Sequence, residues 1–306
     1  MSDSKKYFQP ELISRIPRLY PRAQVVVEGF LAGGHRSRLI GQSSEFMRHR
    51  DYVAGDDTRF IDWKVWARQD RLCVRQQQQE TNRCFAILVD HSRSMGYCGK
   101  VWTKYDCAGT LAVSLVWLAT LRLDAACCVL FNGGVTESTG FRTGRDAALI
   151  AAQRLEECVP VCDDRVTEEG NTDLAEPFRY VGANLARGGL VAIISDLFVD
   201  TQSLYHGIEQ LRHQGHEVVV FHVLDDDELD FPFEERSRFE GLESSRILRC
   251  DPRTVRTCYC DLIEEYVTQL KQNCLRRGAK YGLLRTSQPL DAALALFFAK
   301  RGKGRD

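Results

Sequence analysis

Short, uninterrupted apolar runs alternate with longer amphipathic stretches from residue 84 to the end of the chain. The runs at 84–90, 125–131, 190–195, 217–224, 246–249 and 281–284 are typical of strands, and the most apolar of them are typical of strands buried on both faces. Helices are predicted between and after them, at 105–123, 146–157, 172–185, 201–214, 251–277 and 289–299. This alternation predicts an α/β fold with a doubly wound, mostly parallel sheet.

The first part of the chain has a different texture. Residues 1–82 are polar, arginine-rich and punctuated by glycines, with only short signals: a helical stretch near 11–20 and an apolar Val25-Val26-Val27. We therefore expect a β-rich N-terminal extension over 1–82, packed on a main α/β domain over 83–306 that closes with a helix, a strand and a helix.

Charge and composition exclude several classes of protein. The chain has 41 basic and 42 acidic residues, which favours neither nucleic acid nor an anionic membrane as a partner. Its N-terminus lacks the apolar core of a signal peptide, and no stretch reaches the ~18 apolar residues of a membrane span. A cytoplasmic protein without a membrane span is expected.

The cysteines do not form a zinc motif. There are 12, without paired C-x-x-C spacing, and in the cytoplasm they should be reduced. Cys84, Cys107, Cys127 and Cys128 stand among apolar residues and are expected to pack as small hydrophobic side chains.

Oxygen-bearing side chains follow two of the predicted central strands. Asp90 ends the first and begins the sequence Asp90-x-Ser92-x-Ser94, Asp196 ends another, and Thr172 opens a helix between them. In doubly wound sheets ligands bind at the carboxyl ends of the strands. Carboxylate and hydroxyl oxygens suit a hard cation such as Mg²⁺. The alternative is that Asp90 and the serines only cap the next helix, but capping requires neither Thr172 nor Asp196.

This set resembles the metal-ion-dependent adhesion site of von Willebrand factor A domains, in which D-x-S-x-S combines with a distant Thr and a distant Asp. The resemblance implies a von Willebrand factor A-like fold and a site for Mg²⁺, or Mn²⁺ or Ca²⁺, formed by Asp90, Ser92, Ser94, Thr172 and Asp196. It also implies a non-enzymatic module for protein–protein interaction.

A second signature precedes the first central strand. It reads G-Q-S-S-E-F at 41–46, R-D-Y-x-x-G-D-D-x-R-x-I-D-W-K at 50–64 and A-R at 67–68. It is similar to that of the domain-of-unknown-function 58 family, closely from Gly41 to about Asp90 and more loosely to Leu296. The resemblance implies work with a MoxR-type AAA+ ATPase in the chaperone-like assembly or maturation of a client complex.

The charged 50–64 segment itself allows two interpretations. The one we favour is a β-hairpin turning at Gly55-Asp56, which packs Ile61 and Trp63 on the main domain while opposite charges pair. The other is a surface for a partner.

A hydrolase is the alternative function. Ser92 or Ser94 could be the nucleophile, with His91 or His222 as base and Asp196 as its orienting group. The chain lacks the G-x-S-x-G motif that presents a nucleophilic serine in the α/β-hydrolases.

Two further possibilities depend on groups that the sequence does not reveal. A metal-dependent phosphatase built on Asp90 would need a second carboxylate or a lysine nearby, and Arg93 is a poor substitute. A nucleotide-binding module is disfavoured because 96–100 is too short for a phosphate-binding loop.

Overall fold

A six-stranded sheet forms the centre of the main domain in the computed structural model. The structure describes residues 9–32, 48–53, 61–76, 83–121, 123–160, 174–235, 237–242 and 247–298. Its strand order is β10-β7-β6-β3-β4-β5. The strands are β3 (Cys84–Asp90), β4 (Ala125–Phe131), β5 (Val135–Ser138), β6 (Leu190–Ser195), β7 (Glu217–Leu224) and β10 (Lys280–Arg285). Every pairing is parallel except that of β5 with β4. Numbered along the chain, this is the doubly wound order 3-2-1-4-5-6, so the predicted fold class is confirmed.

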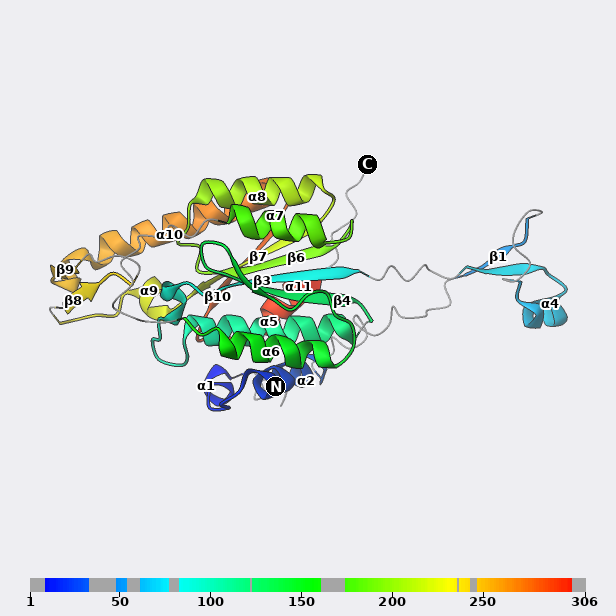
Figure 1. Cartoon of the computed structure of the whole chain (residues 1–306), viewed down its shortest axis with the longest axis horizontal. Helices are drawn as coiled ribbons and strands as arrows, with labels where there is room; N and C mark the ends of the chain where they lie inside the picture. The colour runs from blue at the N-terminus through cyan, green and yellow to red at the C-terminus, as the bar shows by residue number, and fades with distance from the viewer. Residues whose placement is uncertain are drawn as a thin grey trace.

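Helices cover both faces of the sheet (Figure 1). One face carries α2 (Leu19–Phe30), α5 (Lys104–Thr120), α6 (Asp146–Glu157) and α11 (Asp291–Phe298). The other carries α7 (Ala175–Asn184), α8 (Thr201–His213) and α10 (Pro252–Arg276). Alternate residues of β3 enter the two apolar cores, Ile87 on the α5 side and Leu88 on the α8 side, both without solvent exposure. This explains the unbroken apolar run at 84–90.

The described N-terminal residues contain more helix than predicted. After α1 (Pro10–Ile13), α2 takes up the three valines at 25–27, and Val26 and Val27 are buried in the core that α2 shares with α5. The prediction of a β-rich extension is therefore wrong for this stretch, because these residues form the helix α2, whose apolar face packs against α5. The predicted helix at 11–20 lies across α1 and the start of α2.

The segment 48–76 forms a small unit, in which β1 (Arg48–Asp51) pairs antiparallel with β2 (Cys73–Gln76) and α4 (Trp63–Gln69) lies between them in the chain. Ile61 is buried, but Trp63 is 57% exposed. The predicted hairpin is wrong, because β1 pairs with β2 and the chain forms the helix α4 from Trp63 onward. Asp62 accepts a hydrogen bond from the Val65 amide at 3.3 Å, the bond of a helix N-cap. The predicted turn at Gly55-Asp56 lies outside the described residues.

Short elements follow β7 in the chain. The helix α9 (Asp226–Asp230) follows that strand, and β8 (Ser237–Glu240) pairs with β9 (Ile247–Cys250) in a separate two-stranded sheet. Sequence patterns did not predict β5, α9 or β8. Across the described part of the chain, no helix combines the length and apolarity that crossing a bilayer requires.

Candidate functional site

The two predicted carboxylates lie on neighbouring strands at the point where the strand order reverses. Asp90 is the last residue of β3, and Asp196 follows Ser195, the last residue of β6. The two strands are paired in parallel, with Val89 opposite Ile194. This edge of the sheet is where ligands bind in doubly wound folds. We call the loops 90–94 and 195–198 together the rim.

The first loop of the rim gathers three of the predicted residues. Asp90 Oδ1 accepts a hydrogen bond from the Ser92 amide at 2.8 Å, and the hydroxyls of Ser92 and Ser94 are 3.1 Å apart. All three residues are buried. Ser92 stands at the N-cap of the short 3₁₀ helix at 93–96, but its side chain makes no capping bond. Capping therefore does not explain why a serine stands at position 92.

The second loop is tied to the first. The Ser195 hydroxyl donates to Asp90 Oδ2 at 2.6 Å and accepts a hydrogen bond from the Leu197 amide at 2.9 Å. Leu197 has a φ of +56°, a left-handed conformation that is rare for a bulky residue and common at functional sites. Its carbonyl accepts a hydrogen bond from the Tyr266 hydroxyl on α10 at 2.5 Å.

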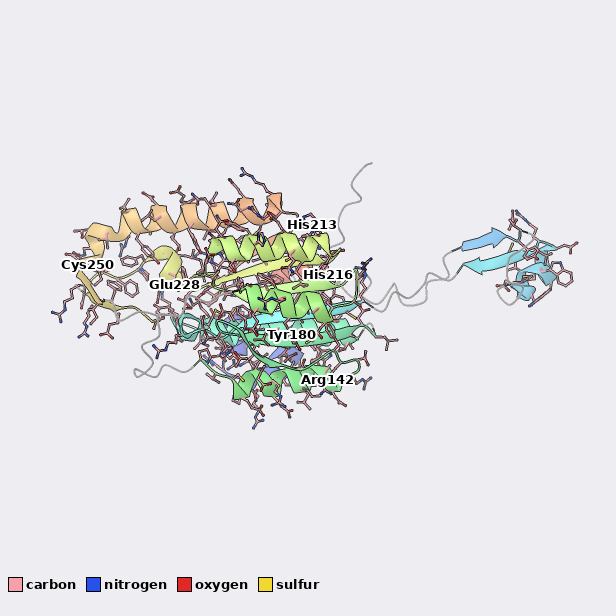
Figure 2. All side chains as sticks on the ribbon, turned by 45° about the horizontal axis from the view of Figure 1, so that its top comes forward. Arg142, Tyr180, His213, His216, Glu228 and Cys250 are labelled. Carbon is pink, nitrogen blue, oxygen red and sulfur yellow. The ribbon has the colours of Figure 1, made fainter. Side chains whose placement is uncertain are left out.

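A buried lysine that sequence reasoning missed completes the described rim. Lys104, the first residue of α5, has no solvent exposure, and its ammonium lies 2.8 Å from Asp196 Oδ2 and 2.7 Å from Glu228 Oε1. The Phe198 ring lies against the same ammonium, with 5.2 Å between Nζ and the ring centroid. Figure 2 labels Glu228 on α9, the helix that follows β7. A sequence signal did exist, since a cation in the first turn of an otherwise apolar helix opposes the helix dipole.

Burial and charge act differently on these groups. Burial, together with the nearby negative charge of Asp196, raises the pKa of Asp90 to about 7, against the opposing effect of the Ser195 and Ser92 hydrogen bonds. Burial alone would lower the pKa of Lys104, but the carboxylates of Asp196 and Glu228 outweigh it and raise that pKa. Burial also raises the pKa of Glu228 despite its ion pair with Lys104.

The donor chemistry fits a hard cation. Asp90 and Asp196 offer carboxylate oxygens and Ser92 and Ser94 offer hydroxyls, the ligand types that Mg²⁺ takes. In the part of the chain that the structure describes, no group of three or more His, Cys, Asp or Glu side chains is placed to hold a metal. A cation at the rim would thus depend on hydroxyl donors beside the two aspartates. Thr172, the fifth predicted ligand, lies outside the described residues.

The two candidate catalytic histidines are bonded elsewhere. His91 Nε2 lies 2.9 Å from Thr136 Oγ1, and His222 Nδ1 lies 2.7 Å from the Tyr281 hydroxyl. Burial lowers the pKa of His222 to about 4. Neither of these bonds joins a histidine to Ser92.

Solved structures of low similarity match most of the chain. BatB from Bacteroides thetaiotaomicron is 16% identical with a TM-score of 0.47, over 70% of this chain and 95% of that one. An aerotolerance-related membrane protein from Bacteroides fragilis is 14% identical with a TM-score of 0.48, over 71% and 98%. The SpRpn10 VWA domain is 8% identical with a TM-score of 0.41, over 72% and 100%. Likeness at this level carries no conclusion about function.

Sequence comparison is more informative. Uncharacterized proteins of Mycobacterium bovis and Mycobacterium tuberculosis are 25% identical over 297 residues, which is 96% of this chain and 91% of theirs. The model of the family described as "Protein of unknown function DUF58" matches residues 48–267, from β1 into α10. That match spans the small unit at 48–76, both loops of the rim and Lys104, and covers well over half of the sequence. The chain therefore belongs to the DUF58 family.

Proposed function

We propose that this chain is a non-enzymatic protein-interaction module that holds a partner through a divalent cation at the rim. Asp90, Ser92, Ser94, Thr172 and Asp196 would hold the ion, Mg²⁺ or Mn²⁺. The observation that supports this most is the convergence of Asp90, Ser92 and Ser94 with the β6 loop, through hydrogen bonds of 2.6–3.1 Å.

The hydrogen bonds at Asp90 orient its carboxylate while leaving it able to bind a cation. Its Oδ1 accepts a hydrogen bond from the Ser92 amide, and its Oδ2 accepts one from the Ser195 hydroxyl. A carboxylate oxygen has two lone pairs, so an oxygen that accepts one hydrogen bond can still bind a cation or a water on it. A bound cation would supply a coordination position for a carboxylate of the partner, since Mg²⁺ in proteins usually keeps several exchangeable waters.

The proposed partner is a MoxR-type AAA+ ATPase with a client complex, as family resemblance suggests. We propose that the ATPase supplies the nucleotide hydrolysis and that this chain supplies recognition.

Calorimetric titration with Mg²⁺ or Mn²⁺ and capture of the purified ATPase, with and without a chelator, test the proposal together. We expect Asp90→Ala to abolish both the titration signal and the capture. Asp200→Asn is the matched control, because Asp200 is an exposed carboxylate that caps α8 and asparagine caps as well. Identical flat titrations for the wild type and for Asp90→Ala would contradict the proposal.

The phosphatase alternative is the stronger of the two enzymatic hypotheses, because a second carboxylate, Asp196, lies close enough to Asp90 to raise its pKa, and the Lys104 ammonium lies beside that second carboxylate. The ammonium of Lys104, however, is fully buried and engaged by two carboxylates rather than presented to a substrate. Turnover of phosphomonoesters that disappears in Asp90→Asn would overturn the interaction proposal in favour of catalysis.

A further inference from the structure

A permanent positive charge lies at the rim. The Lys104 ammonium is within 2.8 Å of Asp196 and has no solvent exposure. Asp196 is one of the two carboxylates described at the rim, so a positive charge from inside the fold already lies beside one of them. Asp90, in contrast, is held by a backbone amide and a hydroxyl, which are neutral.

We infer that Lys104 is a resident counter-cation that shares Asp196 with the divalent ion and thereby keeps the metal affinity of the rim low. This inference rests on the proposed metal site. In a buried setting the repulsion between an ammonium and a divalent ion a few ångströms away is large, because the effective dielectric constant is far below that of water. Removing the lysine charge should therefore strengthen divalent binding by at least about tenfold.

Glu228 gives the ammonium a second partner. Its Oε1 lies 2.7 Å from Lys104 Nζ, while its Oε2 accepts the Asp225 amide at 2.8 Å within the capping box of α9. Lys104 can therefore remain paired inside the protein when Asp196 is shared with a cation. Without Glu228 the ammonium would depend on Asp196 alone and compete for it more strongly.

The Phe198 ring supports the same arrangement. It follows Asp196 by two residues, its amide lies 3.3 Å from Asp196 Oδ1, and its ring lies over the ammonium. An aromatic face stabilises a desolvated cation. The loop that carries the shared carboxylate thus also holds the competing charge in place.

The test is a Mn²⁺ titration of the full-length chain, in which electron paramagnetic resonance measures the concentration of free Mn²⁺. We expect Lys104→Met to bind Mn²⁺ about tenfold more tightly than the wild type, and Glu228→Gln to bind it about threefold or more weakly. Asp227→Asn is the matched control, because it removes a charge from the same helix, where Asp227 accepts a bond from Tyr97 rather than from Lys104. It should change the affinity less than about twofold.

A second readout does not depend on the titration. Because a ligand stabilises the state that binds it, Mn²⁺ should raise the thermal midpoint of Lys104→Met more than that of the wild type. Should Lys104→Met fail to fold without metal, Glu228→Gln alone decides, since it retains the lysine. Folded Lys104→Met with unchanged or weaker Mn²⁺ affinity, or Glu228→Gln with tighter binding, would overturn the inference.

The two proposals fail differently. If Asp90→Ala abolishes Mn²⁺ binding while Lys104→Met leaves the affinity unchanged, the metal site stands and the role given to Lys104 falls. If Asp90→Ala leaves Mn²⁺ binding intact, both as a single substitution and when combined with Lys104→Met, the metal site falls and the inference falls with it.

Discussion

The two loops of the rim hold equally buried aspartates in opposite electrostatic settings. Asp90, at the end of β3, accepts hydrogen bonds from neutral donors, Ser92 and Ser195. Asp196, at the end of β6, faces a buried ammonium that also pairs with Glu228. Among the described residues, the Asp90 carboxylate on the β3 loop has no cationic partner, whereas the Asp196 carboxylate on the β6 loop has one that it shares with Glu228.

This difference indicates on which side of the rim a buried negative charge costs the most free energy. Hydrogen bonds from neutral groups reduce the cost of burying a charge but do not cancel it. The raised pKa of Asp90, about 7, reflects that remaining cost. The left-handed backbone of Leu197 and the buried carboxylate of Asp90 are features that cost stability, as is common at functional sites.

The largest expected effect comes from removing the charge that balances the β6 loop. In the presence of a chelator, Lys104→Met should lower the free energy of unfolding by about 3–5 kcal/mol, because it removes the positive charge paired with two buried carboxylates. Urea denaturation measures this loss. Lys271→Met, at an exposed position of α10, is the control and should stay within about 0.5 kcal/mol. An equally small loss for Lys104→Met would mean that the ion pairs contribute little.

Removing the charge on the β3 loop should instead raise the free energy of unfolding. The pKa of Asp90 is raised from 3.8 to about 7, so the folded state binds more protons than the unfolded state between these values, and stability falls as the pH rises through that window. In a chelator at pH 8, Asp90→Asn should therefore raise the free energy of unfolding by about 2–3 kcal/mol, and the gain should vanish near pH 4. Denaturation at the two pH values measures it; a destabilised Asp90→Asn at pH 8 would contradict the comparison.

A third effect probes the strand beneath the Asp196 loop. His222 pairs in register with Ser195, and burial lowers the pKa of His222 from 6.5 to about 4. Since the unfolded state then binds more protons between these values, this histidine costs stability as the pH falls below 6.5.

Between pH 7 and pH 4.5, the free energy of unfolding of His222→Gln should fall by about 2 kcal/mol less than that of the wild type. Thermal or urea unfolding at both pH values gives the difference. His213→Gln, at an exposed position near the end of α8, should leave the acid-induced loss as in the wild type. The same slope for His222→Gln and the wild type would show that His222 is not the group responsible.

The smallest effect on the free energy of unfolding is expected outside the rim, at Trp63. Because Trp63 is 57% exposed, Trp63→Ala should change the free energy of unfolding by no more than about 0.5 kcal/mol. Ile61→Ala, at a buried position two residues earlier, should cost about 2 kcal/mol or more. If the two variants were equally destabilised, Trp63 would be packed against the protein in solution.

Local patterns predicted the parts of the fold that depend on neighbours in sequence. The strands at 84–90, 125–131, 190–195 and 217–224 and the helix at 146–157 have the predicted bounds. Period and apolar content are sufficient there because each segment is buried by the sheet or against it. They failed at β5, α9 and β8, which are short segments with few buried side chains.

The sequence by itself determined the membership of the DUF58 family, the doubly wound sheet, and the loop in which Asp90, Ser92 and Ser94 meet, since two-residue spacing in a turn after a strand brings such side chains together. Only the tertiary structure decided what Asp196 pairs with. Lys104 lies 92 residues before Asp196 and 124 before Glu228, and no local periodicity connects them. The start of α5, the end of β6 and the helix α9 lie together at one edge of the sheet. Because a buried charge is stable only when it is paired, the charged side chains of these elements form ion pairs there.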